Sequence, residues 1–230
     1  MMRYDFHLHS ALSPCGDMDM TPNNIVNMAM LNGLDAIALS DHNAIGNVAA
    51  AMEVGRSVGV KVIPAMEVAT AEEVHILTLY PTLDAAEFVA KRVYEALPDI
   101  PNQPEIFGQQ ALMNAQDEVV GCEEKLLINA CRLSLEELFR LVTEAGGVFI
   151  PAHVDRHSYS VLTNLGFIPD DLDIRWIEVS RRVTDISAYL DSRPDLAHYS
   201  ILQNSDAHYL EDIAQDGGEL ESGLETLFRR

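Results

Sequence analysis

The chain has 230 residues, 48% of them hydrophobic, which is enough to bury one substantial core as a single domain. Its formal net charge of -21, from 36 acidic and 15 basic residues, would repel a phosphate backbone, so we expect no long nucleic acid as a partner. No apolar run approaches the ~18 residues of a membrane helix or forms a signal-peptide core, which favours a cytoplasmic protein with no membrane partner.

Short apolar runs alternate with longer helical patterns along the chain, which is typical of repeated strand-helix units and a parallel sheet. Thr21 followed by Pro22 predicts the start of the first helix, because a capping hydroxyl and a proline at the first helical position both favour a helix N-terminus. Further helices are predicted from about residue 48, over residues 83–97, and from a capping box that begins at Ser134. The predicted strands cover residues 3–9, 35–39, 60–63, 74–80, 148–151, 174–179 and 199–203.

Residues 98–131 interrupt this rhythm with three prolines near their start, followed by acidic, glycine-punctuated sequence. We expect this segment to be an insertion or a lid within a single domain of residues 1–230. Seven strands in an α/β pattern predict a closed or nearly closed barrel. In such barrels the functional residues gather at the C-terminal ends of the strands, which is where this sequence places its histidines and carboxylates.

Seven of the eight histidines belong to a spaced series with carboxylates. His7 and His9 are two residues apart on a predicted strand, so both face the same side and could share one metal. Glu67, at a strand end, has two oxygens and could bridge two cations. Each motif alone could equally be a solvent-facing polar group, but the series indicates a multinuclear metal site for hydrolysis. The other members are His42, His75, His153, His157, Asp206 and His208.

The order of these motifs resembles the polymerase and histidinol phosphatase family, the PHP domain. That family's pattern is an HxH pair, a DH pair, a lone Glu and His, an AH and a terminal DxH, and the match runs from His7 to His208. The resemblance implies a distorted seven-stranded (β/α) TIM-like barrel with two or three divalent metal ions, Zn, Mn or Fe. It implies one metal on His7, His9, Glu67 and Asp206, a second on Glu67, His75 and His153, and a third on Asp17, His42 and His208.

Three details qualify this ligand set. Asp17 has Asp19 two residues away as an alternative ligand. Asp41 is expected to orient a neighbouring group rather than to bind metal directly. Cys15, Cys122 and Cys131 include no C-x-x-C pair, so we expect them to be reduced and mostly structural.

The predicted function is a metal-dependent phosphoesterase that hydrolyses a small phosphomonoester or a short phosphodiester by attack of metal-bound hydroxide. Asp206 or His208 is expected to help move the leaving-group proton, with the third metal as the alternative. Arg156 is expected to bind the phosphate through its planar guanidinium, with a solvent-exposed loop position as the alternative. His157 is expected to contact the substrate, or else to pair with His153 on a metal.

Other classes of protein fit the sequence less well. The main alternative is an exonuclease or a polymerase-associated nuclease acting on nucleotides or short oligonucleotides, because the family fold also occurs there. A metal amidohydrolase begins with the same HxH pair but commonly uses a bridging modified lysine, whereas Glu67 stands at that strand end here. A non-enzymatic relative would be expected to have lost ligands. Arg181 and Arg182 end the sixth predicted strand, where one could face the pocket or both could form surface ion pairs.

Overall fold

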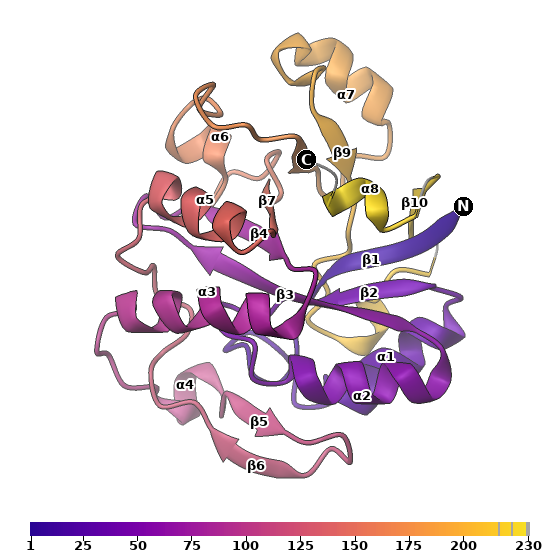
Figure 1. The fold of residues 1–230 in the computed structure, drawn as a ribbon, viewed down its shortest axis with the longest axis vertical. Helices are drawn as coiled ribbons and strands as arrows, with labels where there is room; N and C mark the ends of the chain where they lie inside the picture. The colour runs from indigo at the N-terminus through magenta and orange to yellow at the C-terminus, as the bar shows by residue number, and fades with distance from the viewer. Residues whose placement is uncertain (216, 222, 229–230) are drawn as a thin grey trace.

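The computed structural model describes residues 1–215, 217–221 and 223–228, and it has a mixed α/β fold built on a curled six-stranded sheet (Figure 1). The strand order in this sheet is β10-β1-β2-β3-β4-β7. The strands are β1 (Met2–Leu8), β2 (Ala36–Leu39), β3 (Lys61–Ala69), β4 (His75–Leu79), β7 (Val148–Pro151) and β10 (Gly218–Leu220). Five of them lie where the sequence predicts strands, whereas the edge strand β10 was not predicted.

The directions of the strands differ from the predicted parallel sheet. β1, β2 and β3 are parallel, but β4 runs antiparallel to β3, and β7 and β10 run antiparallel to β4 and β1. A tight turn joins β3 to β4, in which the Thr70 amide donates to the Val74 carbonyl at 2.9 Å. This connection is far shorter than the dozen or more residues that a parallel crossover needs, so β4 must fold straight back.

One of the two smaller sheets lies beside the main one. β8 (Trp176–Glu178) and β9 (Ser200–Leu202) form a parallel pair beside β7, where the Val154 amide donates to the Glu178 carbonyl at 2.8 Å. The chain after β9 returns to β1, because the His9 amide donates to the Ala207 carbonyl at 3.0 Å. The strands therefore curl as a half-barrel, and the predicted closed barrel of seven strands is not confirmed.

Most helices pack over one face of the sheet with apolar residues between, and an inner apolar cluster that includes Leu227 lies on the other face. Phe6, Leu77 and Ile150, from three different strands, share one inner cluster with Leu202 of β9. The longer helices are α1 (Pro22–Leu31), α2 (Val48–Val58), α3 (Leu83–Ala96) and α5 (Leu135–Glu144), and the shorter ones are α4 (Pro104–Phe107), α6 (Val161–Asn164), α7 (Ile186–Ser192) and α8 (Glu225–Phe228). Within the described part of the chain, no helix is long and apolar enough to cross a membrane.

Two helix starts confirm their sequence signals. The Thr21 hydroxyl accepts a hydrogen bond from the Asn24 amide, and Pro22 occupies the first turn of α1. Both hydrogen bonds of the Ser134–Glu137 capping box are present at α5. Each such cap satisfies backbone amides that the helix itself leaves without a partner.

Residues 98–131 form an annex to the sheet, with α4 and a two-stranded hairpin of β5 (Ala111–Met113) and β6 (Val119–Cys122) at the bottom of the view in Figure 1. The buried side chain of Asn47, just before α2, anchors it from both sides. Its Nδ2 donates to the Ala111 carbonyl at 3.0 Å, and its Oδ1 accepts from the Met113 amide at 2.8 Å. The segment is thus hydrogen-bonded to the core, while its action as a lid stays a prediction.

Candidate metal centre

Eight of the predicted ligands lie close together. They come together where the ends of β1, β2, β7 and β9 approach β3 and β4. We call these eight residues the histidine cluster: His7, His9, His42, Glu67, His75, His153, Asp206 and His208. All six of its members before Asp206 are buried. Residues as far apart as 197 positions in the chain touch here, since His9 Nε2 lies 3.1 Å from Asp206 Oδ1.

Glu67, which is only 1% exposed, stands at the centre of the cluster. Its Oε1 lies 2.9 Å from His75 Nδ1, 3.2 Å from His153 Nε2 and 3.3 Å from His7 Nε2, and its Oε2 lies 3.1 Å from His42 Nδ1 and 3.4 Å from His9 Nε2. Burial opposes the charge of this carboxylate, but the surrounding imidazoles, His75 foremost, hold its pKa well below the usual range. Each of its oxygens therefore faces nitrogen donors, as a carboxylate that bridges two cations would.

Asp206 closes the cluster from the other side. Its Oδ1 lies 3.4 Å from His7 Nε2, and its Oδ2 lies 2.6 Å from Arg156 Nη1. Burial opposes ionisation, yet His7 and His9 lower the pKa of this carboxyl. Asp206 and His153 both have positive φ, at 53° and 32°. Such backbone costs of order 1–3 kcal/mol at a non-glycine residue, so the surrounding contacts must hold both side chains in place.

Glu178 orients His7, and the sequence analysis did not identify it. Both of its oxygens lie 3.0 Å from His7 Nδ1, which leaves His7 Nε2 directed into the cluster. Glu178 also accepts hydrogen bonds from the His153 amide at 2.9 Å and from Asn204 Nδ2 at 2.6 Å. A glutamate inside a short apolar strand was the available signal, because an acidic side chain is rarely fully buried unless it is paired.

Asp41 acts on His9 through a serine. The Ser13 hydroxyl donates to Asp41 Oδ1 at 2.7 Å and lies 3.0 Å from His9 Nδ1. Asp41 also accepts from the Ser10 amide and hydroxyl, each at 2.7 Å. Asp41 therefore fixes the ring of His9 so that Nε2 points at Glu67 and Asp206.

The protonation of the histidines differs with their neighbours. Burial disfavours the charged form of His7, but Glu178, Glu67 and Asp206 together raise its pKa well above the usual value. Burial lowers the pKa of His42. Burial and the nearby charge of His9 lower the pKa of His208 to about 4. His42 and His208 therefore present neutral imidazoles, the form that binds metal.

Three groups of side chains have donor atoms close enough to hold a metal ion, each within 4.8 Å of the others in its group. The mixed nitrogen and carboxylate donors suit Zn, Mn or Fe, so these residues fit the divalent ions that the sequence predicts. His153 joins none of the three groups, although it contacts Glu67. The groups are His7, His9 and Asp206; His42, Glu67 and His75; and His9, Cys15, His42 and His208.

Asp17 is not brought into any of these groups. One oxygen of its carboxylate accepts a hydrogen bond from the Asp19 amide at 2.8 Å within its own turn, and the residue is half-buried. Cys15, two residues earlier in the same loop, belongs to the group with His9, His42 and His208. Asp17 stays a predicted ligand, and its neighbour Asp19 is exposed.

The cluster opens into a cavity of about 200 Å³. Arg156, Ser158 and Tyr159 line one wall, and the Tyr159 ring stacks on His75 with 4.6 Å between the centroids. Ile128, from the annex, lines another wall. His157 is exposed and does not line this cavity, so the structure places the two residues after it, and not His157 itself, beside the cluster.

A second, more open cleft of about 440 Å³ adjoins the cluster, and we call it the arginine cleft. Arg181 and Arg182 occupy the centre of a turn in which the Val183 amide donates to the Ser180 carbonyl at 3.1 Å. Neither arginine forms an ion pair with any residue that the structure describes. The cleft is lined by Arg156, Ser180, Arg181, Arg182, Ser205, Asp206, His208 and Asp212.

The sequence matches the family model of the PHP domain over residues 5–160. A curated 5'-3' exoribonuclease from Haemophilus influenzae is 32% identical over 80 residues, which make up 34% of this chain and 28% of that protein. The chain therefore spans well under half the length of this relative.

Solved structures share the fold at low sequence identity. A lesion-specific endonuclease Q from Pyrococcus furiosus has a TM-score of 0.68 and 21% identity, covering 91% of this chain and 49% of that one. A predicted metal-dependent phosphoesterase from Bifidobacterium adolescentis has a TM-score of 0.62 and 18% identity, covering 98% of this chain and 95% of that one. This chain is thus about half as long as endonuclease Q.

The prediction that excluded a long nucleic acid was wrong. Endonuclease Q has also been solved with a 27-mer duplex that carries an abasic lesion at the active site, and that chain matches this one with a TM-score of 0.65 and 21% identity over 91% of this chain. A net charge of -21 is a property of the whole surface. Binding depends on the local field, and the arginine cleft is a local excess of positive charge beside the cluster.

Proposed function

The chain belongs to the PHP domain family, and we propose that it is a metal-dependent hydrolase of phosphoester bonds that acts on small phosphomonoesters or short phosphodiesters. The observation that carries this proposal is the position of Glu67, whose two oxygens face five imidazoles in a buried site. A buried carboxylate with so many nitrogen donors is expensive to build unless cations occupy it.

Each predicted metal position has a set of side chains that would hold it. His7, His9, Glu67 and Asp206 would hold the first ion, and Glu67, His75 and His153 the second. His42 and His208 would hold the third. When bound, divalent ions lower the pKa of water toward ~7 and neutralise charge on a phosphate.

Arg156 is the side chain best placed to bind a substrate phosphate. Its Nη1 lies 2.6 Å from Asp206 Oδ2, and its Nε is buried without a hydrogen-bond partner in the described chain. Its guanidinium therefore borders both the cavity and the arginine cleft with donors to spare. A planar fork of this kind binds two phosphate oxygens at once, which fixes the orientation of the phosphorus.

Asp206 and His208 are the proposed groups for moving the leaving-group proton. Both side chains line the cavity and the arginine cleft, so they border the path by which the alcohol would leave. The His208 Nδ1 lies 2.8 Å from the Asp206 carbonyl oxygen, which leaves Nε2 as the nitrogen that would either hold the third ion or carry the proton, because one lone pair cannot do both. A proton moved at either side chain would neutralise the departing alkoxide.

The test is turnover on a panel of phosphomonoesters, short phosphodiesters and nucleotides, with protein reconstituted with Mn or Zn beside His9→Ala. We expect metal-dependent release of phosphate or alcohol that falls by more than ~100-fold in the variant. Exposed His198→Ala serves as the matched control, because it removes a histidine outside the cluster and should keep full activity. Turnover that survives both chelation and His9→Ala would contradict the proposal.

A nuclease that acts on nucleotides or oligonucleotides is the second candidate function. The arginine cleft supports it, because Arg181 and Arg182 line it without ion-pair partners among the described residues and could bind the phosphates that flank the scissile one. The 32% identity to a 5'-3' exoribonuclease over 80 residues points the same way. Release of mononucleotides from 5'-phosphorylated RNA or DNA oligomers, tested in the same panel, separates this candidate from a phosphatase.

A further inference from the structure

Cys15 lies in a loop that the fold holds tightly against the histidine cluster. The loop follows β1 and turns twice, with the Ser13 amide donating to the Ser10 carbonyl at 3.0 Å and the Gly16 amide donating to the Ser13 carbonyl at 2.9 Å. Any side chain at Gly16 would collide with the Ser10 carbonyl oxygen, so this close turn requires glycine. The Asp17 amide then donates to the His208 carbonyl at 3.0 Å, which ties the loop to the last ligand of the cluster.

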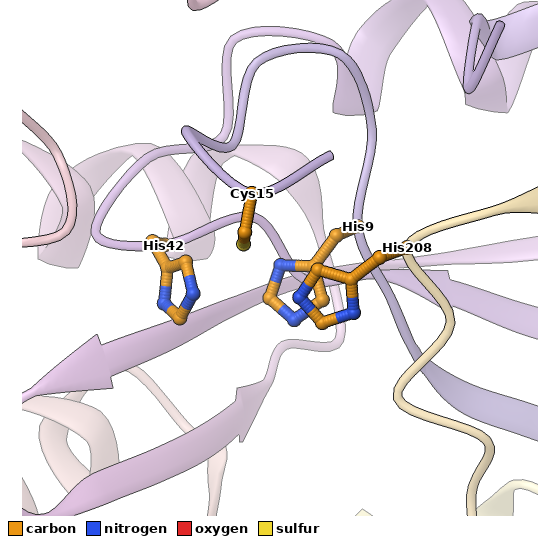
Figure 2. Close-up of side chains that lie close together, drawn as sticks. All are labelled: His9, Cys15, His42 and His208. Carbon is orange, nitrogen blue, oxygen red and sulfur yellow. The ribbon is translucent and has the colours of Figure 1, made fainter. Parts of the chain in front are cut away.

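The thiol of Cys15 is one of four potential metal donors at this point. The ligand atoms of His9, Cys15, His42 and His208 all lie within 4.8 Å of one another. Figure 2 shows the sulfur directed into the space between the His42 and His9 rings, with His208 beside His9. The ring of His9 lies 4.7 Å from that of His42 and 4.4 Å from that of His208, centroid to centroid.

One histidine beside Cys15 has a buried ring nitrogen without a hydrogen bond in the described chain. His42 is 5% exposed, and its Nδ1 makes no hydrogen bond in the described chain, although Glu67 Oε2 lies 3.1 Å away. The other ring nitrogen of His208 is directed away from its contact with the Asp206 carbonyl. A buried nitrogen without a hydrogen bond is costly, and a metal ion would satisfy it.

His9 cannot complete this site and the first site together. Its Nδ1 lies 3.0 Å from the Ser13 hydroxyl, so only Nε2 remains, and that nitrogen lies 3.1 Å from Asp206 Oδ1. One nitrogen lone pair binds one metal, so His9 belongs with Asp206 and His7. The third position is then left with Cys15, His42 and His208, three protein ligands of the kind that leave one coordination position open for water or substrate.

We propose that Cys15 is a thiolate ligand of the third metal ion, together with His42 and His208, in the place where the family resemblance predicted Asp17. This inference rests on the proposed function only in taking the cluster to be a metal site. Binding replaces the S–H bond by a sulfur–metal bond and releases one proton to water, with no change of oxidation state. A soft sulfur donor makes this position favour Zn or Fe over Mn, which prefers oxygen donors.

The remaining cysteines provide matched controls. Cys131 is 2% exposed and its backbone amide donates to the Ala69 carbonyl in the core, whereas Cys122 is exposed at the end of β6. Neither belongs to a group of potential metal ligands. Asp17→Asn tests the alternative ligand directly, because it keeps the size of the side chain and removes its charge.

The experiment is to load the protein with Co(II) and to record the near-ultraviolet absorption that a thiolate-cobalt bond produces, together with metal content by elemental analysis. We expect the band in the wild type, Asp17→Asn, Cys122→Ser and Cys131→Ser, and its loss in Cys15→Ser with a drop of about one metal equivalent. A band that persists in Cys15→Ser, or a wild type that holds its full cobalt content without the band, would overturn the proposal.

A second measurement avoids the need for a variant that folds. Wild-type protein is alkylated with iodoacetamide before and after zinc is added, and each cysteine is followed by peptide mass spectrometry. Zinc should protect Cys15 at least tenfold and leave the rate at Cys122 unchanged, whereas equal alkylation of Cys15 in both states would refute thiolate ligation. Neither readout depends on turnover, so a protein that shows the cobalt band but hydrolyses no ester would contradict the proposed function and not this ligand.

Discussion

The histidine cluster and the arginine cleft share one wall but are built in opposite ways. The cluster is buried, and contacts that join six parts of the chain hold its imidazoles and carboxylates around Glu67. The cleft is open, and its two outer arginines lie on a turn without ion-pair partners among the described residues. The cluster is therefore organised before a substrate binds, which catalysis requires. The cleft instead offers positive charge that can bind negatively charged groups of the substrate. Changes in the cluster should affect kcat, and changes in the cleft should affect KM.

The largest effect is expected from Glu67→Gln, at the centre of the histidine cluster. The substitution keeps the shape of the side chain but removes the charge that faces five imidazoles, so metal binding should fail. We expect kcat to fall by more than ~100-fold, with at least one metal equivalent lost by elemental analysis. Glu95→Gln, an exposed glutamate on α3, should change neither quantity. A Glu67→Gln variant with full metal content and full activity would remove the basis for a bridging role.

Glu178→Gln tests whether Glu178 orients the ring of His7 in the histidine cluster. Glu178 lies 3.0 Å from His7 Nδ1 and does not touch the cavity, so it is a positioning residue. We expect metal affinity or kcat to fall roughly 10- to 100-fold, as is typical for carboxylates behind a metal-binding histidine. A purely structural role would lower the urea midpoint but leave the metal affinity of the folded protein unchanged, so metal titration decides between the two roles while urea unfolding reports stability.

The double variant Arg181→Ala with Arg182→Ala tests whether the arginine cleft binds substrate. We expect KM to rise about tenfold, equivalent to about 1.4 kcal/mol, with kcat little changed. The increase should diminish at high salt, because exposed charges are screened. Replacing both arginines by lysine should restore part of the affinity, since it keeps the charge and loses the planar fork. A fall in kcat at constant KM would instead assign the turn to catalysis.

The smallest expected effect is on stability as a function of pH in metal-free protein. Burial opposes the charge of Glu178, but His7 lowers its pKa below the usual range. A carboxyl whose pKa is lowered by folding stabilises the protein above its unfolded value of ~4.3, and this contribution is lost as pH falls through the folded value. The wild type should therefore exceed Glu178→Gln in urea midpoint near pH 6, with the difference shrinking toward pH 3. A difference that grows on acidification would contradict this pairing.

Much of the cluster follows from the sequence because strand geometry links spacing to direction. His7 and His9 are two residues apart, and both reach the same site from one strand end. Asp206 and His208 repeat the spacing, although their backbone is irregular there. Five strands of the main sheet lie close to their predicted positions, because each is an apolar run bounded by turns.

The directions of side chains in loops could not be predicted from the sequence. Asp17 fits the family pattern and stays a predicted ligand, although one of its oxygens accepts from the Asp19 amide in its own turn and the Cys15 thiol lies among the histidine nitrogens. Spacing within a loop does not specify direction, because every turn can send a side chain to either side. His157 is a similar case, since the neighbouring Tyr159 contacts His75 while His157 is exposed.

The sequence places histidines and carboxylates at strand ends in an order that matches the PHP domain family, so the candidate metal ligands could be chosen without the structure. Tertiary structure alone decided which of them touch, which direction β4 takes, and that Glu178 supports His7 from 171 positions away. It also placed two arginines beside the site of a strongly acidic chain. Sequence spacing governs only the contacts within one strand or turn. Contacts between distant segments depend on how the whole sheet curls around its core.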